Sequence, residues 1–174
     1  MTKIIFAAIL LCLTFCKSPE KSIQKTTNSE IVNLSKCPEN GVCTIELLEN
    51  KSLTILQDGI GATYYQLKED ASKSVVHFKY ERNKIENTSD SGHIEEIVFE
   101  INKNENNLSI ENAELQDTKM LFGRHCFCKG SAGYYMVKTG KLKISTEKEK
   151  TLYKLYFKVN NLPQLFSEVQ FYQK

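Results

Sequence analysis

The sequence predicts an all-β fold, a single antiparallel β-sandwich or β-barrel-like domain of about 8–10 strands after an N-terminal signal peptide. Two observations lead to this prediction. From Cys37 onward, apolar and polar side chains alternate along the chain, as expected of strands that bury one face. Turn signals recur about every 8–12 residues, the spacing typical of sandwiches and barrels. The alternation is the same in both architectures, so the choice between them stays open.

The first predicted strands lie on either side of a glycine-containing turn. Apolar residues alternate with polar ones over residues 43–47 and 53–55, and again over 63–67. The turn is Asp58–Gly61, whose two glycines can take the positive φ that a tight hairpin needs. The pattern therefore predicts a hairpin centred on this turn.

Two further strands are separated by a polar loop. Val76–Tyr80 and Ile97–Ile101 each place apolar side chains on one face and charged ones on the other. Residues Asn83–Gly92 between them are polar and turn-like, and Asn102–Asn107 form a second polar loop.

Four more strands and one helical turn complete the predicted domain. A hairpin is expected to join Tyr134–Lys138 to Leu142–Ile144 through a Thr-Gly turn. Tyr153–Val159 alternates cleanly, and Val169–Phe171 is the last strand. A helical turn is expected within Leu162–Glu168, where a proline can occupy the first position.

The composition is that of an ordinary globular protein with one domain. The chain has 174 residues, of which 41% are hydrophobic and 25% charged. Only one stretch is continuously apolar, which excludes a membrane protein with several spans. The 23 basic and 21 acidic residues give a net charge of +2, too balanced for a nucleic-acid-binding surface. No nucleic-acid partner is therefore expected.

The N-terminus has the order of charges and apolar residues found in export signals. Lys3 precedes the apolar run Ile4–Phe15, which is too short to cross about 30 Å of hydrocarbon at ~1.5 Å per residue. We expect residues 1–15 to be a signal peptide, 16–36 a flexible polar tether and 37–174 a single β-domain.

The cysteine that ends the apolar run points to lipidation. Leu13–Cys16 resembles the bacterial lipobox, although Phe15 stands where that motif normally has Gly, Ala or Ser. The resemblance implies that Cys16 is diacylated and becomes the first residue of the mature protein. The alternative is a plain secretory signal, with Cys16 incidental.

Four cysteines remain in the exported domain, and an oxidising compartment favours disulfides. In one strand, Cys126 and Cys128 would share a face with Cβ atoms about 6–7 Å apart, beyond the ~4 Å that a disulfide tolerates. Cys37 and Cys43 flank an Asn-Gly turn and could face each other, but that pairing would leave the other two unpaired. We therefore expect two long-range bonds between the 37–43 and 126–128 segments, with the partners left open.

The same residues allow a metal-binding alternative. His125, Cys126 and Cys128 bring an imidazole and two thiols together, a set suited to copper or zinc. In a strand, however, His125 would point away from its cysteine neighbour. We therefore expect no cofactor and keep a copper or zinc site as the alternative. A redox pair is less expected still, because C-x-x-C is missing.

No catalytic motif is present, so the sequence favours a non-catalytic protein and leaves an enzyme as the third possibility. Glu95 and Glu96 would point to opposite faces of a sheet and cannot form a carboxylate pair. His77 is expected to be solvated. For a binding face we select Arg124, Lys129 and Tyr134, because Arg and Tyr are frequent anchors of recognition surfaces.

Three segments together resemble small exported lipoproteins of Bacteroidota, flavobacteria in particular: Leu13–Cys16, Cys37–Cys43 and Arg124–Cys128. The resemblance implies a protein of the bacterial cell envelope, lipid-anchored to a membrane, with the outer membrane favoured and the domain on its periplasmic or surface side. It implies no catalytic residue. The expected partners are the membrane, through the lipid, and a protein or small-molecule ligand of a non-catalytic binding or structural module.

Overall fold

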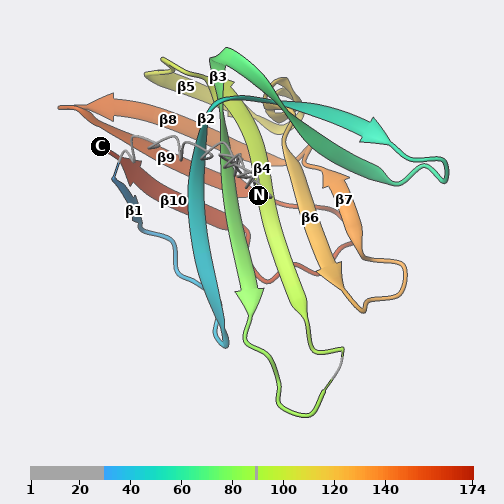
Figure 1. The fold of residues 1–174 in the computed structure, drawn as a ribbon. Helices are drawn as coiled ribbons and strands as arrows, with labels where there is room; N and C mark the ends of the chain where they lie inside the picture. The colour runs from blue at the N-terminus through green and yellow to red at the C-terminus, as the bar shows by residue number, and fades with distance from the viewer. Residues whose placement is uncertain (1–29, 89) are drawn as a thin grey trace, which may run out of the picture.

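The protein is a β-sandwich. The computed structural model describes residues 30–88 and 90–174, and in them two five-stranded antiparallel sheets pack against each other (Figure 1). The predicted all-β class is confirmed, and of the two architectures left open the sandwich is the one found. The expected signal peptide, Cys16 and most of the expected tether lie outside the described residues.

The two sheets are built from ten strands within the described residues. The first sheet has the order β1-β10-β9-β8-β5, with bounds Ile31–Asn33, Glu168–Gln173, Lys150–Phe157, Gly140–Glu147 and Asn107–Glu111. The second sheet has the order β2-β3-β4-β6-β7, with bounds Gly41–Gln57, Thr63–Arg82, His93–Asn102, Leu121–Cys126 and Gly133–Met136.

The turns that the sequence predicts most strongly are where it places them. β2 and β3 are joined at Asp58–Gly61, where an Asp58 side-chain oxygen accepts hydrogen bonds from the amides of Ile60 (2.9 Å) and Ala62 (2.8 Å). Gly61 has φ 81°, a conformation that glycine adopts without steric cost. The two polar loops likewise connect β3 to β4 and β4 to β5.

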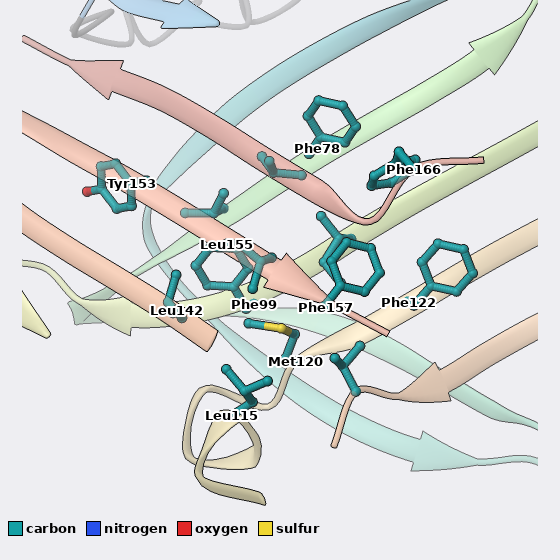
Figure 2. Packing of buried hydrophobic residues seen from close by; sticks show 14 of the residues in the cluster. Phe78, Phe99, Leu115, Met120, Phe122, Leu142, Tyr153, Leu155, Phe157 and Phe166 are labelled. Carbon is teal, nitrogen blue, oxygen red and sulfur yellow. The ribbon is translucent and has the colours of Figure 1, made fainter. Parts of the chain in front are cut away.

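Phenylalanine rings fill the space between the sheets (Figure 2). Phe122 of β6 lies 5.7 Å from the ring of Phe157 on β9 and 6.0 Å from Phe166. Tyr153 and Phe171 stack at 4.4 Å within the first sheet. The chain contains no tryptophan, so Phe and Tyr contribute most of the aromatic area that the core buries.

The predicted hairpin between residues 134–138 and 142–144 is wrong, because β7 and β8 belong to different sheets. β7 pairs with β6, whereas β8 pairs with β5 and β9. The chain crosses between the sheets at Val137, which is fully buried. Gly140 then starts β8 with φ 144°, and a Cβ there would come within 2.2 Å of the Tyr156 carbonyl oxygen. The Thr-Gly pair therefore marks a change of sheet.

Helical structure is also found elsewhere than expected. Residues 162–167 form bends, held in part by the Gln164 side chain, which accepts a hydrogen bond from the Val159 amide (2.7 Å). Within the described residues, the helix is η1, a 3₁₀ helix over Asn112–Thr118 that lies between β5 and β6 in the chain. It is anchored by Leu115, which is fully buried beside Met120 (Figure 2).

The C-terminal part of the expected tether belongs to the domain. β1 pairs antiparallel with β10, and the pairing continues as the Leu34 amide donates to the Gln170 carbonyl (2.8 Å). Ser35 also accepts a hydrogen bond from the Gln170 amide (2.6 Å). Residues 31–35 therefore belong to the domain, although they fall within the expected tether.

The distal half of the β2–β3 hairpin folds back over the outer face of the second sheet. We call residues 51–69 the hairpin flap. The β2–β3 register shifts beside Asn50, which has φ 57°, and the flap turns across β4 toward β6 and β7 (Figure 1). Leu53 then packs with Val75, Val98 and Leu121 in a second, smaller apolar cluster. The flap thus covers part of a face that would otherwise meet solvent.

A buried carboxylate fixes the base of this flap. Glu100 accepts a hydrogen bond from the Leu53 amide (2.7 Å) and one from the Lys119 ammonium (3.0 Å).

Among the described residues, no helix is long and apolar enough to span a bilayer.

Candidate functional site

One end of the sandwich collects both disulfides and four connecting segments. Register places the start of β2 beside the end of β3, and the start of β4 beside the end of β6, because Gly41 pairs with Arg82 and His93 with Cys126. We call this end the disulfide end. It comprises residues 34–43, 83–88, 90–93, 126–132 and 158–167, and the loop between β3 and β4 lies at the bottom of Figure 1.

The predicted long-range disulfides are wrong, because each cysteine pairs with its near neighbour. Cys37 is bonded to Cys43, with Cα atoms 5.8 Å apart, across a turn in which Asn40 has φ 60°. Cys126 is bonded to Cys128, with Cα atoms 5.2 Å apart. β6 ends at Cys126, so Cys128 lies beyond the strand and the straight-strand spacing does not apply to it.

The imidazole beside this cysteine pair belongs to His93 rather than to His125. A ring nitrogen of His93 and the sulfurs of Cys126 and Cys128 lie within 4.8 Å of one another. His93 is directly opposite Cys126 in the β4–β6 register and faces the interior with it. His125 points to the other face of the sheet, as strand alternation requires. The ligand set Cys126, Cys128 and His125 is therefore not brought together.

A buried polar group links His93 to the loop beneath the sandwich. Glu95 is fully buried and pairs with His93 Nε2 at 3.0 Å. It also accepts a hydrogen bond from the Leu165 amide (2.7 Å). Arg124 lies opposite Glu95, with Nε 3.8 Å from its carboxylate, and donates to the Pro163 carbonyl (3.0 Å). These bonds hold the 158–167 loop against the sheet.

This arrangement changes the role of the residues selected for binding. Arg124 is only 9% exposed, and its side chain bonds to the Pro163 carbonyl on the interior side of the sheet. Lys129 is exposed, in the loop that follows the second disulfide. Tyr134 is half-buried on the outer face of β7. The three selected residues therefore do not form one surface.

The outer face of the second sheet carries a cluster of hydrogen bonds centred on Glu96. One oxygen of its carboxylate pairs with His77 Nε2 of β3 at 2.5 Å. The other pairs with His125 Nε2 of β6 at 2.9 Å and with the Tyr134 hydroxyl of β7 at 2.5 Å. We call these four residues the Glu96 cluster. An ionised carboxylate only accepts hydrogen bonds, so the three partners act as donors.

A glycine makes room for these side chains. Gly123 lies opposite Glu96 in the β4–β6 register. A Cβ at this position would come within 2.6 Å of the Tyr134 ring, 2.8 Å of Glu96 Cγ and 2.9 Å of His125 Nε2. The absence of a side chain at residue 123 is therefore a condition for the cluster.

The electrostatics of the cluster favour an ionised carboxylate with no affinity for a proton near neutral pH. Burial raises the pKa of Glu96, but hydrogen bonds from His125, His77 and Tyr134 outweigh it and hold the pKa far below its usual range. Burial and the hydrogen bond to Glu96 raise the pKa of the Tyr134 hydroxyl. Burial and the Glu96 charge also raise the pKa of Tyr65, which contacts Tyr134 from the flap. The cluster is thus a poor general base and a strong tie between strands.

We expect Glu96→Gln to lower the free energy of unfolding by about 2 kcal/mol at pH 7, because hydrogen bonds to a charged acceptor are lost. The folded-state pKa of Glu96 is depressed, so its contribution is present above the usual pKa of 4.5 and is lost as the pH falls below it. Urea unfolding from pH 7 to pH 3 measures this, and the difference in free energy between the two proteins should narrow progressively below pH 4.5. The control is Glu168→Gln, at an exposed position at the start of β10 in the other sheet. A constant difference at all pH values would contradict the prediction.

This cluster is not predictable from the alternation of residues along single strands. His77 was expected to be solvated, yet it is partly buried against Glu96. The opposite orientations of Glu95 and Glu96 were predicted correctly. Glu95 points to the interior and pairs with His93, whereas Glu96 points to the outer face and pairs with His125. The missing information was the register, which sets His77 and His125 diagonally on either side of Glu96.

Comparisons with protein-family models, with curated proteins and with solved structures found no match to this chain.

Proposed function

We propose that the chain is a lipid-anchored, non-catalytic binding module of the bacterial envelope, which presents its disulfide end to a protein partner. The observation that carries the proposal is the position of the two ends of the domain. Glu30 pairs with Lys174 through both backbone (3.1 Å) and side chain (2.8 Å), so the described chain starts beside the C-terminus. In Figure 1 this point lies away from the disulfide end.

The geometry suits a domain held at a distance from a membrane. β10 runs from Glu168 at the disulfide end to Gln173, and a strand of this length spans about 20 Å. The chain between Cys16 and Glu30 would reach at most about 50 Å when extended. A lipid on Cys16 would then leave the disulfide end free to face away from the bilayer.

The disulfide end has features typical of a recognition surface. Phe127 is 85% exposed at the tip of the loop that the second disulfide closes, and Ile85 is 57% exposed in the neighbouring loop. Two open grooves border Phe127, one of about 380 Å³ and one of about 450 Å³. A large aromatic side chain held on a closed loop loses little conformational freedom when it enters a partner's pocket. A projecting anchor of this kind fits a protein partner better than a small ligand.

The anchor is tested by substitution of Cys16 in the native host. We expect the wild-type protein to fractionate with membranes and its mature N-terminal peptide to carry the mass of a diacylated cysteine. Cys16→Ser should be exported without lipid and move to the soluble envelope fraction. An unmodified Cys16, or a membrane-bound Cys16→Ser, would refute the anchor.

The binding surface is tested with a photo-crosslinking amino acid at position 127 in living cells. We expect one discrete crosslinked product that is absent when the same amino acid replaces Ile60 or Tyr156. Both are suitable controls, because Ile60 is 91% exposed at the flap tip and Tyr156 is 58% exposed on β9. Equal products from all three positions, or none from position 127, would refute this surface.

A further inference from the structure

The two disulfides of this domain lie in different surroundings. Cys37 and Cys43 are also half-buried, pack against the main hydrophobic core, and Cys37 borders a groove of its own, so the difference between the two disulfides is the imidazole beside the second one. Cys126 and Cys128 are half-buried on either side of the exposed Phe127, and both line an open groove. Cys126 also lines the second groove, together with His93. An attacking thiol can therefore reach the second disulfide from solvent.

We propose that Cys126–Cys128 is a redox-active disulfide that undergoes thiol–disulfide exchange with a dithiol, while Cys37–Cys43 is structural. The sequence disfavoured a redox pair because C-x-x-C is missing. The structure adds a buried imidazole with a ring nitrogen within 4.8 Å of both sulfurs, held in place by Glu95. An imidazole beside a cysteine pair favours the thiolate that exchange requires.

The exchange is balanced by the dithiol alone. One thiol of the dithiol gives its proton to His93 and attacks a sulfur of the disulfide. The Cys126–Cys128 bond breaks, a mixed disulfide forms, and the leaving cysteine takes the proton back from His93. The second thiol then attacks the mixed disulfide, and its proton passes to the cysteine that is released. The dithiol loses two electrons and two protons, and the cysteine pair gains them.

The structure assigns distinct roles to the surrounding residues. A ring nitrogen of His93 lies within 4.8 Å of both reacting sulfurs, whereas Glu95 positions the ring through the 3.0 Å contact to Nε2. Phe127 separates the two cysteines and would meet the partner first, because it is almost fully exposed. The charged or titratable groups facing His93 are Glu95 on its own strand and Arg124 behind it, and those bordering the same groove are Glu81, Arg82, Lys84, Asp90 and His125.

The first test uses the mature wild-type protein in detergent. It is equilibrated in dithiothreitol buffers of graded reduction potential, alkylated, digested and analysed by mass spectrometry, so that each cysteine pair is followed separately. We expect Cys126–Cys128 to be half-reduced at a less negative potential than Cys37–Cys43. Simultaneous reduction of the two pairs, or earlier reduction of Cys37–Cys43, would overturn the proposal.

The second test isolates the imidazole. His93→Asn retains a side chain that can hydrogen-bond to Glu95 but removes the titrating group. We expect it to slow reduction of Cys126–Cys128 by dithiothreitol at least tenfold at pH 7 and to leave the rate at Cys37–Cys43 unchanged. In the reduced protein, iodoacetamide alkylation of Cys126 and Cys128 should begin at a higher pH in the variant. If the variant does not fold, the order of reduction in the wild type still decides.

The same ligand atoms could instead bind a soft metal ion after reduction. The reduced wild-type protein is therefore mixed with one equivalent of Zn²⁺ before oxidised dithiothreitol is added. Reoxidation of Cys126–Cys128 at an unchanged rate supports exchange. Stoichiometric Zn²⁺ retention that blocks reoxidation would overturn the proposal in favour of a metal site. The readouts do not involve Cys16, so failure here is separable from failure of the lipid anchor.

Discussion

Replacing Phe122 by alanine is expected to lower the free energy of unfolding by about 3–5 kcal/mol. Phe122 is fully buried at the centre of the sandwich, where its ring contacts Phe157 from the opposite sheet and Phe166 from the 158–167 loop. Truncation removes apolar area and leaves a cavity between two sheets that are each held rigid by backbone hydrogen bonds. The loss should therefore be near the upper part of the range for aromatic residues.

The measurement is urea unfolding followed by far-ultraviolet circular dichroism. Tyr156→Ala is the matched control, since Tyr156 is adjacent in sequence to Phe157 but 58% exposed on the outer face of β9. We expect the control to change the free energy of unfolding by less than about 0.5 kcal/mol. A loss below about 1 kcal/mol for Phe122→Ala would mean that the two sheets are not packed through this ring.

Gly123→Ala is expected to lower the free energy of unfolding by about 3 kcal/mol, an unusually large effect for the addition of one methyl group. Overpacking alone costs about 1–3 kcal/mol. Here the added methyl group would meet the Glu96 side chain and two of the side chains that donate hydrogen bonds to its carboxylate. Tyr134, Glu96 and His125 would all have to move, which breaks hydrogen bonds to a buried charge. Steric and polar losses are therefore expected to add.

Two measurements separate these contributions. Urea unfolding gives the total loss, and the imidazole N–H signals in nitrogen-15 NMR report whether His77 and His125 still donate to Glu96. The control is Gly92→Ala, because Gly92 precedes β4 and a Cβ there would meet nothing within 4 Å. Retention of both imidazole signals together with wild-type stability would contradict the prediction.

Much of the fold could be predicted from alternation, because this signal depends on local burial. The predicted stretches within β3, β4 and β9 were recognisable for that reason, and each contributes core side chains to the sandwich. Alternation cannot tell which sheet a strand joins. The Thr-Gly pair before β8 looked like a hairpin turn, yet the chain crosses there from one sheet to the other. β1 was missed because three residues are too few to show a pattern.

The candidate sites were less predictable, because they depend on register and on strand ends. The disulfide pairing failed at a single assumption, that Cys126 and Cys128 both lie within a straight strand. The metal alternative chose His125, the neighbour in sequence, whereas the neighbour in space is His93 from the adjacent strand. Neither relation is visible without the alignment of β4 with β6. The orientation of His125 away from Cys126 was available from alternation alone.

The hairpin flap has a consequence for how the protein unfolds and aggregates when it is heated. Its apolar contacts centre on a small cluster that is separate from the main core, with four buried residues and four partly buried ones packed against them. Local opening should therefore cost less than global unfolding, and the flap amides should exchange with deuterium before those of the other strands. Opening would uncover an apolar strip formed by Val75, Val98 and Leu121 on an otherwise intact sheet. Heat-induced aggregation would then begin from a nearly native protein, through this strip, and at temperatures below the main unfolding transition.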